Sequence, residues 1–284
     1  MIAILMSTYN GEKYVSEQIE SILTQSYQDW CLYIRDDGSI DNTSRIIDSY
    51  RQQYPAKIRL VEDGLGNLGA GFSFLKLLES IDADYYMFCD QDDVWLPAKI
   101  EKSYKKMLGV EKCQITPTPI CIFSDVCVVN EDLSVRYESL WKSNKRNPKD
   151  STDVYMAVVS RFPSLGCTML MNRNVKDYVF PVTDFVSKQG GHDEWIAFIM
   201  AAKGIMDYVD EPLLLYRRHG DNLSEYEGRA LTPSKVIKSL FIKPVAVVRH
   251  FVVMRKRLKL LPISLFFPRI LLAYVKKWAY IIHY

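Results

Sequence analysis

Short apolar segments alternate with amphipathic helical segments through the first 110 residues, and this alternation strongly constrains the fold. Strand-like runs are expected at residues 2–6, 30–35, 58–61 and 85–89. Each run is followed by a polar turn and then by a segment whose apolar residues recur every three or four positions. A β-α-β-α order requires a mainly parallel sheet with right-handed crossover helices. We therefore expect an α/β domain with a Rossmann-like central sheet.

The rest of the chain alternates less regularly. Shorter strands are expected at 120–123, 126–129, 165–171, 206–209 and 213–216, with a helix from the Gly190-Gly191 pair to about residue 202. Residues 136–153 are polar and predict a mobile loop. The length of 284 residues suits one large domain with an appendage. We predict a domain over 1–228, with two halves at 1–110 and 111–228.

The two ends of the chain differ in charge. Residues 229–284 hold 12 Lys/Arg and no Asp/Glu, which leaves 24 basic and 34 acidic residues in 1–228. This basic tail (229–284) mixes apolar, aromatic and basic residues in a pattern typical of amphipathic helices, with no apolar run near the roughly 20 residues that a membrane span needs. We expect it to lie on an anionic membrane surface rather than bind nucleic acid. A helical subdomain that packs on the body, or on a second subunit, is the alternative.

The cysteines and the N-terminal residues indicate the cellular compartment. None of the six cysteines forms a C-x-x-C pair with partners at zinc spacing, so we expect buried free thiols in a reducing environment. The chain starts with a strand-like run and shows no basic segment followed by an apolar leader. We predict a cytoplasmic protein, peripheral on the inner face of the membrane.

An apolar run of strand type, 85–89, ends in three carboxylates within four residues: Asp90, Asp92 and Asp93. Unpaired carboxylates beside a core are costly unless a positive charge offsets them. A hard divalent cation such as Mg²⁺ or Mn²⁺ takes carboxylate oxygens and leaves room for phosphate oxygens. The alternative is a solvated acidic turn.

Polar residues also end the other predicted strands. They are Ser7, Thr8 and Tyr9 after the first, Asp36 and Asp37 after the second, and Gly66 and Asn67 after the third. Because the carboxyl ends of parallel strands meet at one edge of a sheet, these residues should share one ligand crevice. The chain has no G-x-x-x-x-G-K-[ST] loop and no G-x-G-x-x-G after its first strand. Phosphate charge must then be neutralised by a metal and basic side chains.

Four motifs carry a family resemblance: S-T-Y-N-G at 7–11, R-D-D-G-S-x-D-x-T at 35–43, G-N-L-G at 66–69 and D-Q-D-D at 90–93. Over roughly residues 1–225 they resemble the inverting family 2 glycosyltransferases of the GT-A fold. The longer phrase at 88–100 is similar to bacterial rhamnosyltransferases of that family, and also occurs in relatives that use other sugars.

The resemblance implies a role for each donor-side residue. Tyr9 would stack on a pyrimidine ring and Asp37 would accept its N3–H, whereas Asp36 contacts the nucleotide or only caps its turn. Asp92 would ligate the cation that joins the two phosphates, with Asp93 as an alternative ligand. The remaining residues expected around the sugar nucleotide are Ser7, Asn67, Asp90 and Gln91.

The resemblance makes 1–110 the nucleotide-binding half and 111–228 the acceptor-binding half, and the catalytic base is expected in the acceptor-binding half. The resemblance implies Asp193, at the start of a helix, as the carboxylate that takes the proton from the acceptor hydroxyl; Glu194 is the rival, and helix capping is the alternative role. His219 would approach the metal, and Arg218 or Arg217 would neutralise the leaving diphosphate. Two further residues, His192 and Trp195, are expected on the acceptor side, although an aromatic residue here is as often core.

These expectations combine into one hypothesis: an Mn²⁺- or Mg²⁺-dependent inverting glycosyltransferase that moves L-rhamnose from dTDP-L-rhamnose onto a lipid-linked or growing polysaccharide. A UDP-hexose donor and a non-catalytic sugar-nucleotide-binding module are the alternatives. A nucleotidyltransferase should carry a lysine-bearing glycine-rich loop after the first strand, and none is present. The oligomeric state is left open, with a homodimer as one possibility.

Overall fold

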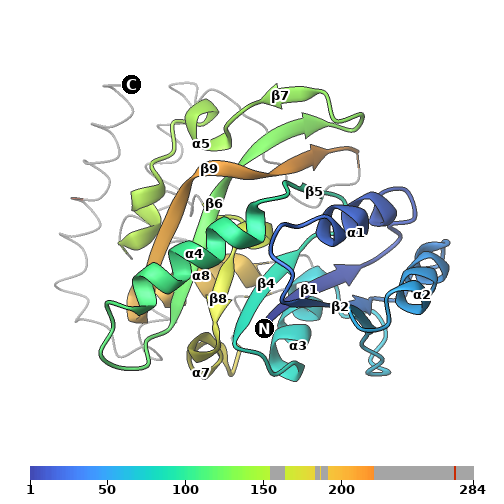
Figure 1. Cartoon of the computed structure of the whole chain (residues 1–284), viewed down its shortest axis with the longest axis horizontal. Coiled ribbons are helices and arrows are strands. Elements are labelled where there is room, and N and C mark those ends of the chain that lie inside the picture. The colour runs from blue at the N-terminus through green and yellow to red at the C-terminus, as the bar shows by residue number, and fades with distance from the viewer. Residues whose placement is uncertain (154–163, 183–185, 187–190, 221–271, 273–284) are drawn as a thin grey trace.

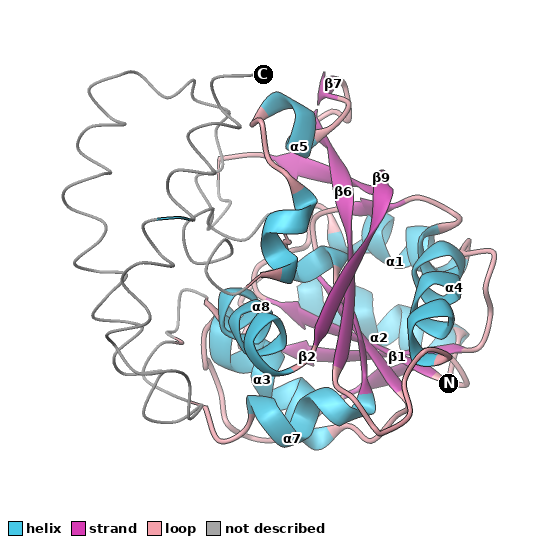
Figure 2. Ribbon diagram, turned by 90° about the vertical axis from the view of Figure 1, so that its left-hand side faces the viewer, coloured by secondary structure: helices cyan, strands magenta, loops and turns pink. Residues whose placement is uncertain are grey.

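A computed structural model describes residues 1–153, 164–182, 186, 191–220 and 272. These residues form one nine-stranded sheet in the order β3-β2-β1-β4-β8-β6-β9-β5, with β7 paired to β6. Helices cover both faces of the sheet, as the two perpendicular views show (Figures 1 and 2).

The first half is the parallel α/β unit that the alternation predicts. Its elements are β1 (Ile2–Thr8), α1 (Val15–Leu23), β2 (Trp30–Asp36), α2 (Thr43–Gln53), β3 (Ile58–Leu60), α3 (Ala70–Ser80), β4 (Tyr85–Cys89), β5 (Val94–Trp95) and α4 (Lys99–Glu111). Strand β1 lies between β2 and β4, and all three are parallel. Parallel pairing in this order brings the carboxyl ends of β1, β2 and β4 together at one edge.

Side chains from the two sides of the sheet enter two separate cores. In β1, Ile2, Ile4 and Met6 pack with α1, α2 and α4, whereas Ala3 and Leu5 pack with α3 and α8. Burial on both faces explains why these strands are continuously apolar rather than alternating.

The second half contains longer elements than predicted. They are β6 (Ile120–Asn130), β7 (Val135–Tyr137), α5 (Leu140–Ser143), η1 (Pro148–Thr152), η2 (Gly166–Thr168), β8 (Leu170–Asn172), η3 (Arg173–Val175), α7 (Lys176–Val179), α8 (His192–Lys203) and β9 (Ile205–Arg218). Strand β8 is antiparallel to both β4 and β6, and β6 is parallel to β9.

Two pairs of predicted strands proved to be single strands. The runs 120–123 and 126–129 belong to a single strand, β6, whose pairing with β9 shifts register near Asp125. Likewise 206–209 and 213–216 belong to the one strand β9. Polar residues separate the apolar runs, and a bulge lets the strand continue through them.

Two segments were also assigned the wrong structure. The expected loop 136–153 contains the end of β7 and the short helices α5 and η1, and Leu140 and Trp141 of α5 are buried. The expected strand 165–171 is a 3₁₀ turn, η2, followed by the short strand β8. Contacts with the rest of the chain determine the structure of both segments, because neither segment has a strong hydrophobic periodicity of its own.

The basic tail lies outside the described residues, apart from Leu272, so its predicted helices remain a prediction. Within the described part of the chain, no helix has the length and apolarity that crossing a membrane requires.

Candidate functional site

The ends of β1, β2 and β4 and the loop after β3 meet at one edge of the sheet, as predicted. The Thr8 hydroxyl donates to Asp36 Oδ1 at 2.9 Å, which joins the first two loops. Asn67 Nδ2 donates to the Asp37 carbonyl at 2.9 Å, which joins the second and third. The strand order therefore brings these loops together at one edge, as the sequence implies.

Asp37 holds the loop after β3 in place. Its carboxylate accepts hydrogen bonds from the backbone N–H groups of Leu68 at 2.8 Å and Gly69 at 2.7 Å, and it also pairs with Arg35. The residue is only 2% exposed. Asp37 thus organises the loop that carries Asn67, and its contact with a pyrimidine base remains a prediction.

Two other donor-side residues differ in exposure. The Tyr9 side chain is 49% exposed at the end of β1, as a ring that stacks on a base must be. Ser7 is half-buried and its hydroxyl donates to Ser73 Oγ at 2.6 Å. Of the two, Tyr9 is the better placed to meet a ligand.

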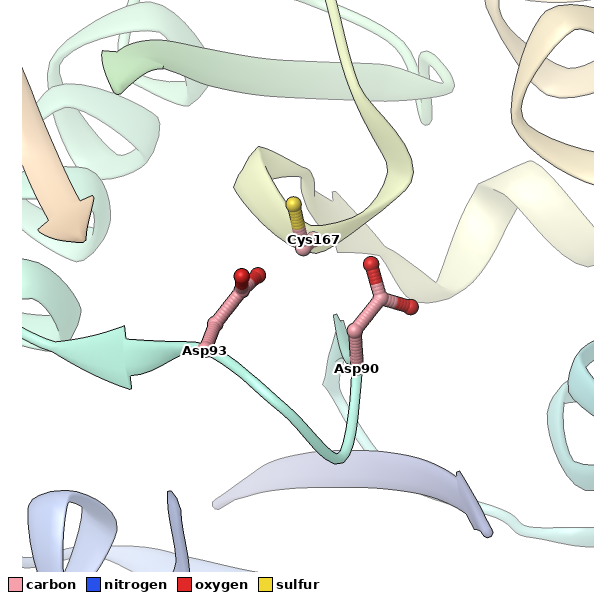
Figure 3. Close-up of side chains that lie close together, drawn as sticks. All are labelled: Asp90, Asp93 and Cys167. Carbon is pink, nitrogen blue, oxygen red and sulfur yellow. The ribbon is translucent and has the colours of Figure 1, made fainter. Parts of the chain in front are cut away.

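Asp93 turns inward from the D-Q-D-D loop. It is 1% exposed, and its Oδ1 accepts the backbone N–H of Arg217 at 3.1 Å. Its carboxylate, that of Asp90 and the Cys167 thiol converge within 4.8 Å of one another (Figure 3). Burial and the negative charges of Asp92 and Asp90 hold the pKa of Asp93 well above its usual range.

Asp90 is half-buried beside this group. Burial, followed by the negative charges of Asp92 and Asp193, raises the pKa of Asp90 to about 7. The charge of Asp193 therefore affects the ionisation of Asp90, although the two residues lie about 100 positions apart in sequence.

Lys99 places a positive charge behind the acids. It is fully buried at the start of α4, its Nζ donates to the Cys167 carbonyl at 3.0 Å, and it lies 4.7 Å from the Trp95 ring centre. Burial lowers the pKa of Lys99 to about 8, while the nearby Cys167, Cys89, Asp93 and Asp90 oppose that change. The sequence analysis missed this residue, because a lysine in a first helical turn usually signals a solvated surface.

His219 reaches the same loop from the end of β9. Its Nε2 lies 2.8 Å from Asp92 Oδ2, and its side chain is 7% exposed. The Tyr14 ring stacks on the imidazole, with ring centres 4.7 Å apart and planes 29° apart. The Tyr14 hydroxyl donates to Glu131 at 2.9 Å, which fixes the ring that orients His219. Tyr14 directly precedes α1, and nothing in the sequence around it indicates this contact.

The neighbouring arginines have different environments. Arg217 is 3% exposed and binds the protein itself: its Nε donates to the Asp92 carbonyl at 2.9 Å, a terminal nitrogen donates to the Glu131 carbonyl at 2.6 Å, and another pairs with Glu17. It ties β9 to the D-Q-D-D loop and to α1. Arg218 is half-buried. Arg217 therefore makes internal contacts, and Arg218 remains the arginine that we expect to neutralise the diphosphate.

Asp193 begins α8 and is held by the η2 turn. Its Oδ2 accepts the backbone N–H of Gly166 at 3.2 Å, and its Oδ1 accepts that of Glu194 at 2.8 Å. A Cβ atom added to Gly166 would lie 3.2 Å from both Asp193 Cβ and His192 Nε2, which is tighter than most real contacts. The next residue, Cys167, contributes to the Asp90–Asp93 group, so η2 links the proposed base to the acids.

The structure does not support the two expected acceptor contacts. Trp195 is 1% exposed, and its indole N–H donates to the Val179 carbonyl at 3.1 Å, so its ring belongs to the core. His192 is 9% exposed and stacks on Phe74, with ring centres 4.6 Å apart. Burial lowers the pKa of His192. Both residues face inward because α8 packs against α3 and β6, which the sequence around them could not indicate.

The side chains at the loop fit a hard divalent cation. Asp92 and His219 offer a carboxylate oxygen and an imidazole nitrogen 2.8 Å apart, close to the roughly 3 Å between neighbouring ligands of an octahedral ion with 2.1 Å bonds. Asp93 Oδ2 is buried without a hydrogen-bond partner among the described residues. The Asp93 carboxylate lies near Asp90 and Cys167 (Figure 3). The Cys167 thiol is a soft ligand that suits neither Mg²⁺ nor Mn²⁺. Asp92 with His219 is therefore the better-matched pair.

The sequence of this chain is similar to those of known proteins. Residues 3–151 match the family model described as "Glycosyl transferase family 2". The dTDP-rhamnosyl transferase RfbG of Shigella flexneri is 27% identical over 227 residues, which are 76% of this chain and 72% of RfbG. The uncharacterized glycosyltransferase alr2836 of Nostoc sp. is 29% identical over 229 residues, 78% of this chain and 66% of alr2836.

Solved structures share the fold. Residues 1–349 of S. aureus TarS, crystallised with UDP-GlcNAc, superpose with a TM-score of 0.57 at 16% identity, over 80% of this chain and 61% of that one. At this identity the likeness concerns the fold alone. The chain therefore spans just under two thirds of the TarS fragment, and between 66% and 72% of the two sequence relatives.

Proposed function

Because this chain belongs to glycosyl transferase family 2, with the GT-A fold that its motifs predict, we propose that it transfers a sugar, with inversion, from a nucleoside diphosphate donor to a glycan. The observation that carries this proposal is the convergence of two distant groups. Asp92 in the D-Q-D-D loop pairs with His219, while Asp193 accepts the N–H of Gly166, whose neighbour Cys167 lies with Asp90 and Asp93 of the same loop. This is the separation of roles that a single displacement needs: one group holds the leaving diphosphate and one carboxylate takes a proton.

Asp193 would act as the general base. The acceptor hydroxyl attacks the anomeric carbon from the face opposite the diphosphate, its proton passes to Asp193, and the bond from the anomeric carbon to the diphosphate oxygen breaks. The Gly166 N–H fixes one carboxylate oxygen, so the base has a defined direction. Glu194 follows Asp193 in α8 and points about 100° away around the helix.

Asp92 and His219 would hold Mn²⁺ or Mg²⁺. When bound, such an ion neutralises charge on the departing diphosphate. Arg218, half-buried beside His219, would add positive charge at the same place. Lys99 stays behind the acids and limits the electrostatic cost of gathering them.

The donor side would recognise a pyrimidine nucleotide. Tyr9 would stack on the base, and Asn67 with the loop held by Asp37 would line the nucleotide. We favour dTDP-L-rhamnose, since the relative RfbG is named a dTDP-rhamnosyl transferase. A UDP-hexose is the second candidate donor, supported by the named UDP-Glc-dependent glucosyltransferase WfgD of Escherichia coli, 33% identical over 110 residues.

The acceptor would be a lipid-linked or growing polysaccharide at the cytoplasmic membrane face. The basic tail supports this location through its 12 Lys/Arg and lack of acids. Flotation of the full chain and of a 1–228 chain with vesicles of anionic lipid tests the idea. Equal flotation of the two proteins would end it.

Calorimetric titration and thermal-shift screening with dTDP-, UDP- and GDP-sugars, each with and without Mn²⁺, test the donor proposal. We expect a metal-dependent response to dTDP-L-rhamnose or to a UDP-hexose, and none to GDP-sugars. No response to any pyrimidine donor would refute the proposal. Donor binding with no effect of Asp193 substitution on the chain's biological activity would favour the non-catalytic binding module.

A further inference from the structure

The side chain of Gln91 joins the loop after β4 to the loop after β1. Its Oε1 accepts the backbone N–H of Tyr9 at 2.9 Å, and its Nε2 donates to the Tyr9 carbonyl at 3.0 Å. One amide thereby satisfies both backbone groups of one residue. A planar side-chain amide can do this because it carries a donor and an acceptor side by side, as a backbone does.

This contact continues the pairing of the two strands beyond their ends. The last β1–β4 pair in register is Met6 with Cys89. The two loops diverge after it, and the Gln91 side chain bridges the gap where backbone pairing has stopped. Tyr9 is therefore held relative to the D-Q-D-D loop, although no ladder bond reaches it.

Gly11 provides an independent observation. A Cβ atom added to Gly11 would lie 2.2 Å from Gln91 Oε1 and 2.5 Å from its Cδ. The loop after β1 thus closes over the Gln91 amide, and only a glycine permits that approach. The Gly11 N–H also donates to Thr43 Oγ1 at 2.7 Å, so the glycine cannot easily move away.

We propose that Gln91 is a positioning residue: it does not recognise the donor itself but sets the place of the Tyr9 ring relative to Asp92. The backbone of Tyr9 is fixed by Gln91, and its side chain is 49% exposed. Asp92 directly follows Gln91. The distance between the base-stacking ring and the diphosphate end of the site is then determined by one side chain. This inference rests on the proposed nucleotide binding and deepens it.

The test separates the two ends of the donor. Gln91→Met keeps the length and removes both hydrogen bonds. We expect its affinity for dTDP and UDP, measured by calorimetry with Mn²⁺, to fall about tenfold. Its affinity for inorganic pyrophosphate with Mn²⁺ should stay within about twofold of the unchanged protein, because the diphosphate end does not depend on Tyr9. In turnover, KM for the donor should rise with little change in kcat.

Two further variants keep the proposal falsifiable. Gly11→Ala should reproduce the selective loss by displacing Gln91, and Gln91→Asn should do so because its amide is one methylene too short to reach Tyr9. Gln114→Met, at a half-buried glutamine near the end of α4, is the matched control and should change neither affinity. Equal loss of dTDP and pyrophosphate affinity, or no loss of either, would overturn the inference. If the unchanged protein binds pyrophosphate but no nucleoside diphosphate, the proposed function fails instead.

Discussion

The Nε2 atom of His219 lies 2.8 Å from Oδ2 of Asp92, although 127 residues separate them in the sequence. The contact joins the end of β9 to the loop after β4. Strand β9 runs between β6 and β5 in the sheet, and β5 directly follows the D-Q-D-D loop. The pairing of β5 with β9 therefore delivers His219 to the acids.

Replacing the proposed base should remove transfer and spare binding. We expect Asp193→Asn to lower kcat by about 10²–10⁴-fold, the usual contribution of a general base. Donor affinity should remain within about threefold, since Asn keeps the size of the side chain and can still accept from Gly166. Initial rates and calorimetry measure the two quantities.

Two comparisons make this result interpretable. Asp177→Asn, at an exposed carboxylate in α7, should leave kcat unchanged. Glu194→Gln should reduce kcat far less than Asp193→Asn does. The reverse ranking would assign the base to Glu194.

The Asp92–His219 pair should determine metal affinity. Tyr14→Leu removes the ring that stacks on His219, and should weaken Mn²⁺ binding by roughly 10–100-fold, as loss of a group that orients a metal ligand does. Asp92→Asn and His219→Ala should each weaken it further. Electron paramagnetic resonance of free Mn²⁺ with a nucleoside diphosphate present gives the dissociation constants. Glu62→Gln, at an exposed residue, is the control, and unaltered Mn²⁺ affinity in His219→Ala would place the metal elsewhere.

Arg217 should contribute to stability rather than to diphosphate binding. Arg217→Met leaves the Asp92 and Glu131 carbonyls without their donor and removes a buried charge that pairs with Glu17. We expect the free energy of unfolding to fall by about 3 kcal/mol, because two hydrogen bonds from a charged donor are lost. Glu17 is 48% exposed, so the ion pair itself adds little. Arg136→Met, at an exposed arginine of β7, should change it by less than about 0.5 kcal/mol in urea denaturation. Equal effects of the two substitutions would contradict this assignment.

Asp90 should make the metal-free protein less stable as pH rises. The pKa of Asp90 is raised to about 7 in the folded protein, whereas an unfolded Asp titrates near 4. Between these values the folded state binds the extra proton, so this group's contribution lowers the free energy of unfolding as pH increases from about 4 to about 7.

The variant Asp90→Asn isolates that contribution. In chelator, its unfolding free energy should match that of the unchanged protein at pH 4 and exceed it by about 2 kcal/mol at pH 8, a value reduced for partial solvent exposure. Denaturation at several pH values measures the difference. A difference that does not grow with pH would show that the Asp90 carboxyl is solvated.

The sequence could predict the parallel half of the fold and most of its site. Apolar runs and helical periods are local properties, and they located β1 to β4 and α1 to α4 to within a few residues. The acids of the D-Q-D-D loop were evident for the same reason, because three carboxylates after a buried strand need a compensating charge wherever that strand lies.

The second half was harder to predict because its elements take their form from distant partners. Polar residues divide the apolar runs of β6 and β9, so each was predicted as two short strands, yet the two strands pair through a bulge. Trp195 and His192 were expected on the acceptor side, yet the packing of α8 turns them inward. Nothing local distinguishes these outcomes.

Residue type and local period thus determined which chemistry the chain can carry: carboxylates at strand ends, an acidic pair at a helix start and a late histidine. Only the tertiary structure decided which of them act together. It joined Asp92 to His219, placed Lys99 behind the acids and committed Arg217 to internal contacts. The physical reason is that burial and pairing depend on the strand order, and strand order is a property of the whole sheet rather than of any segment within it.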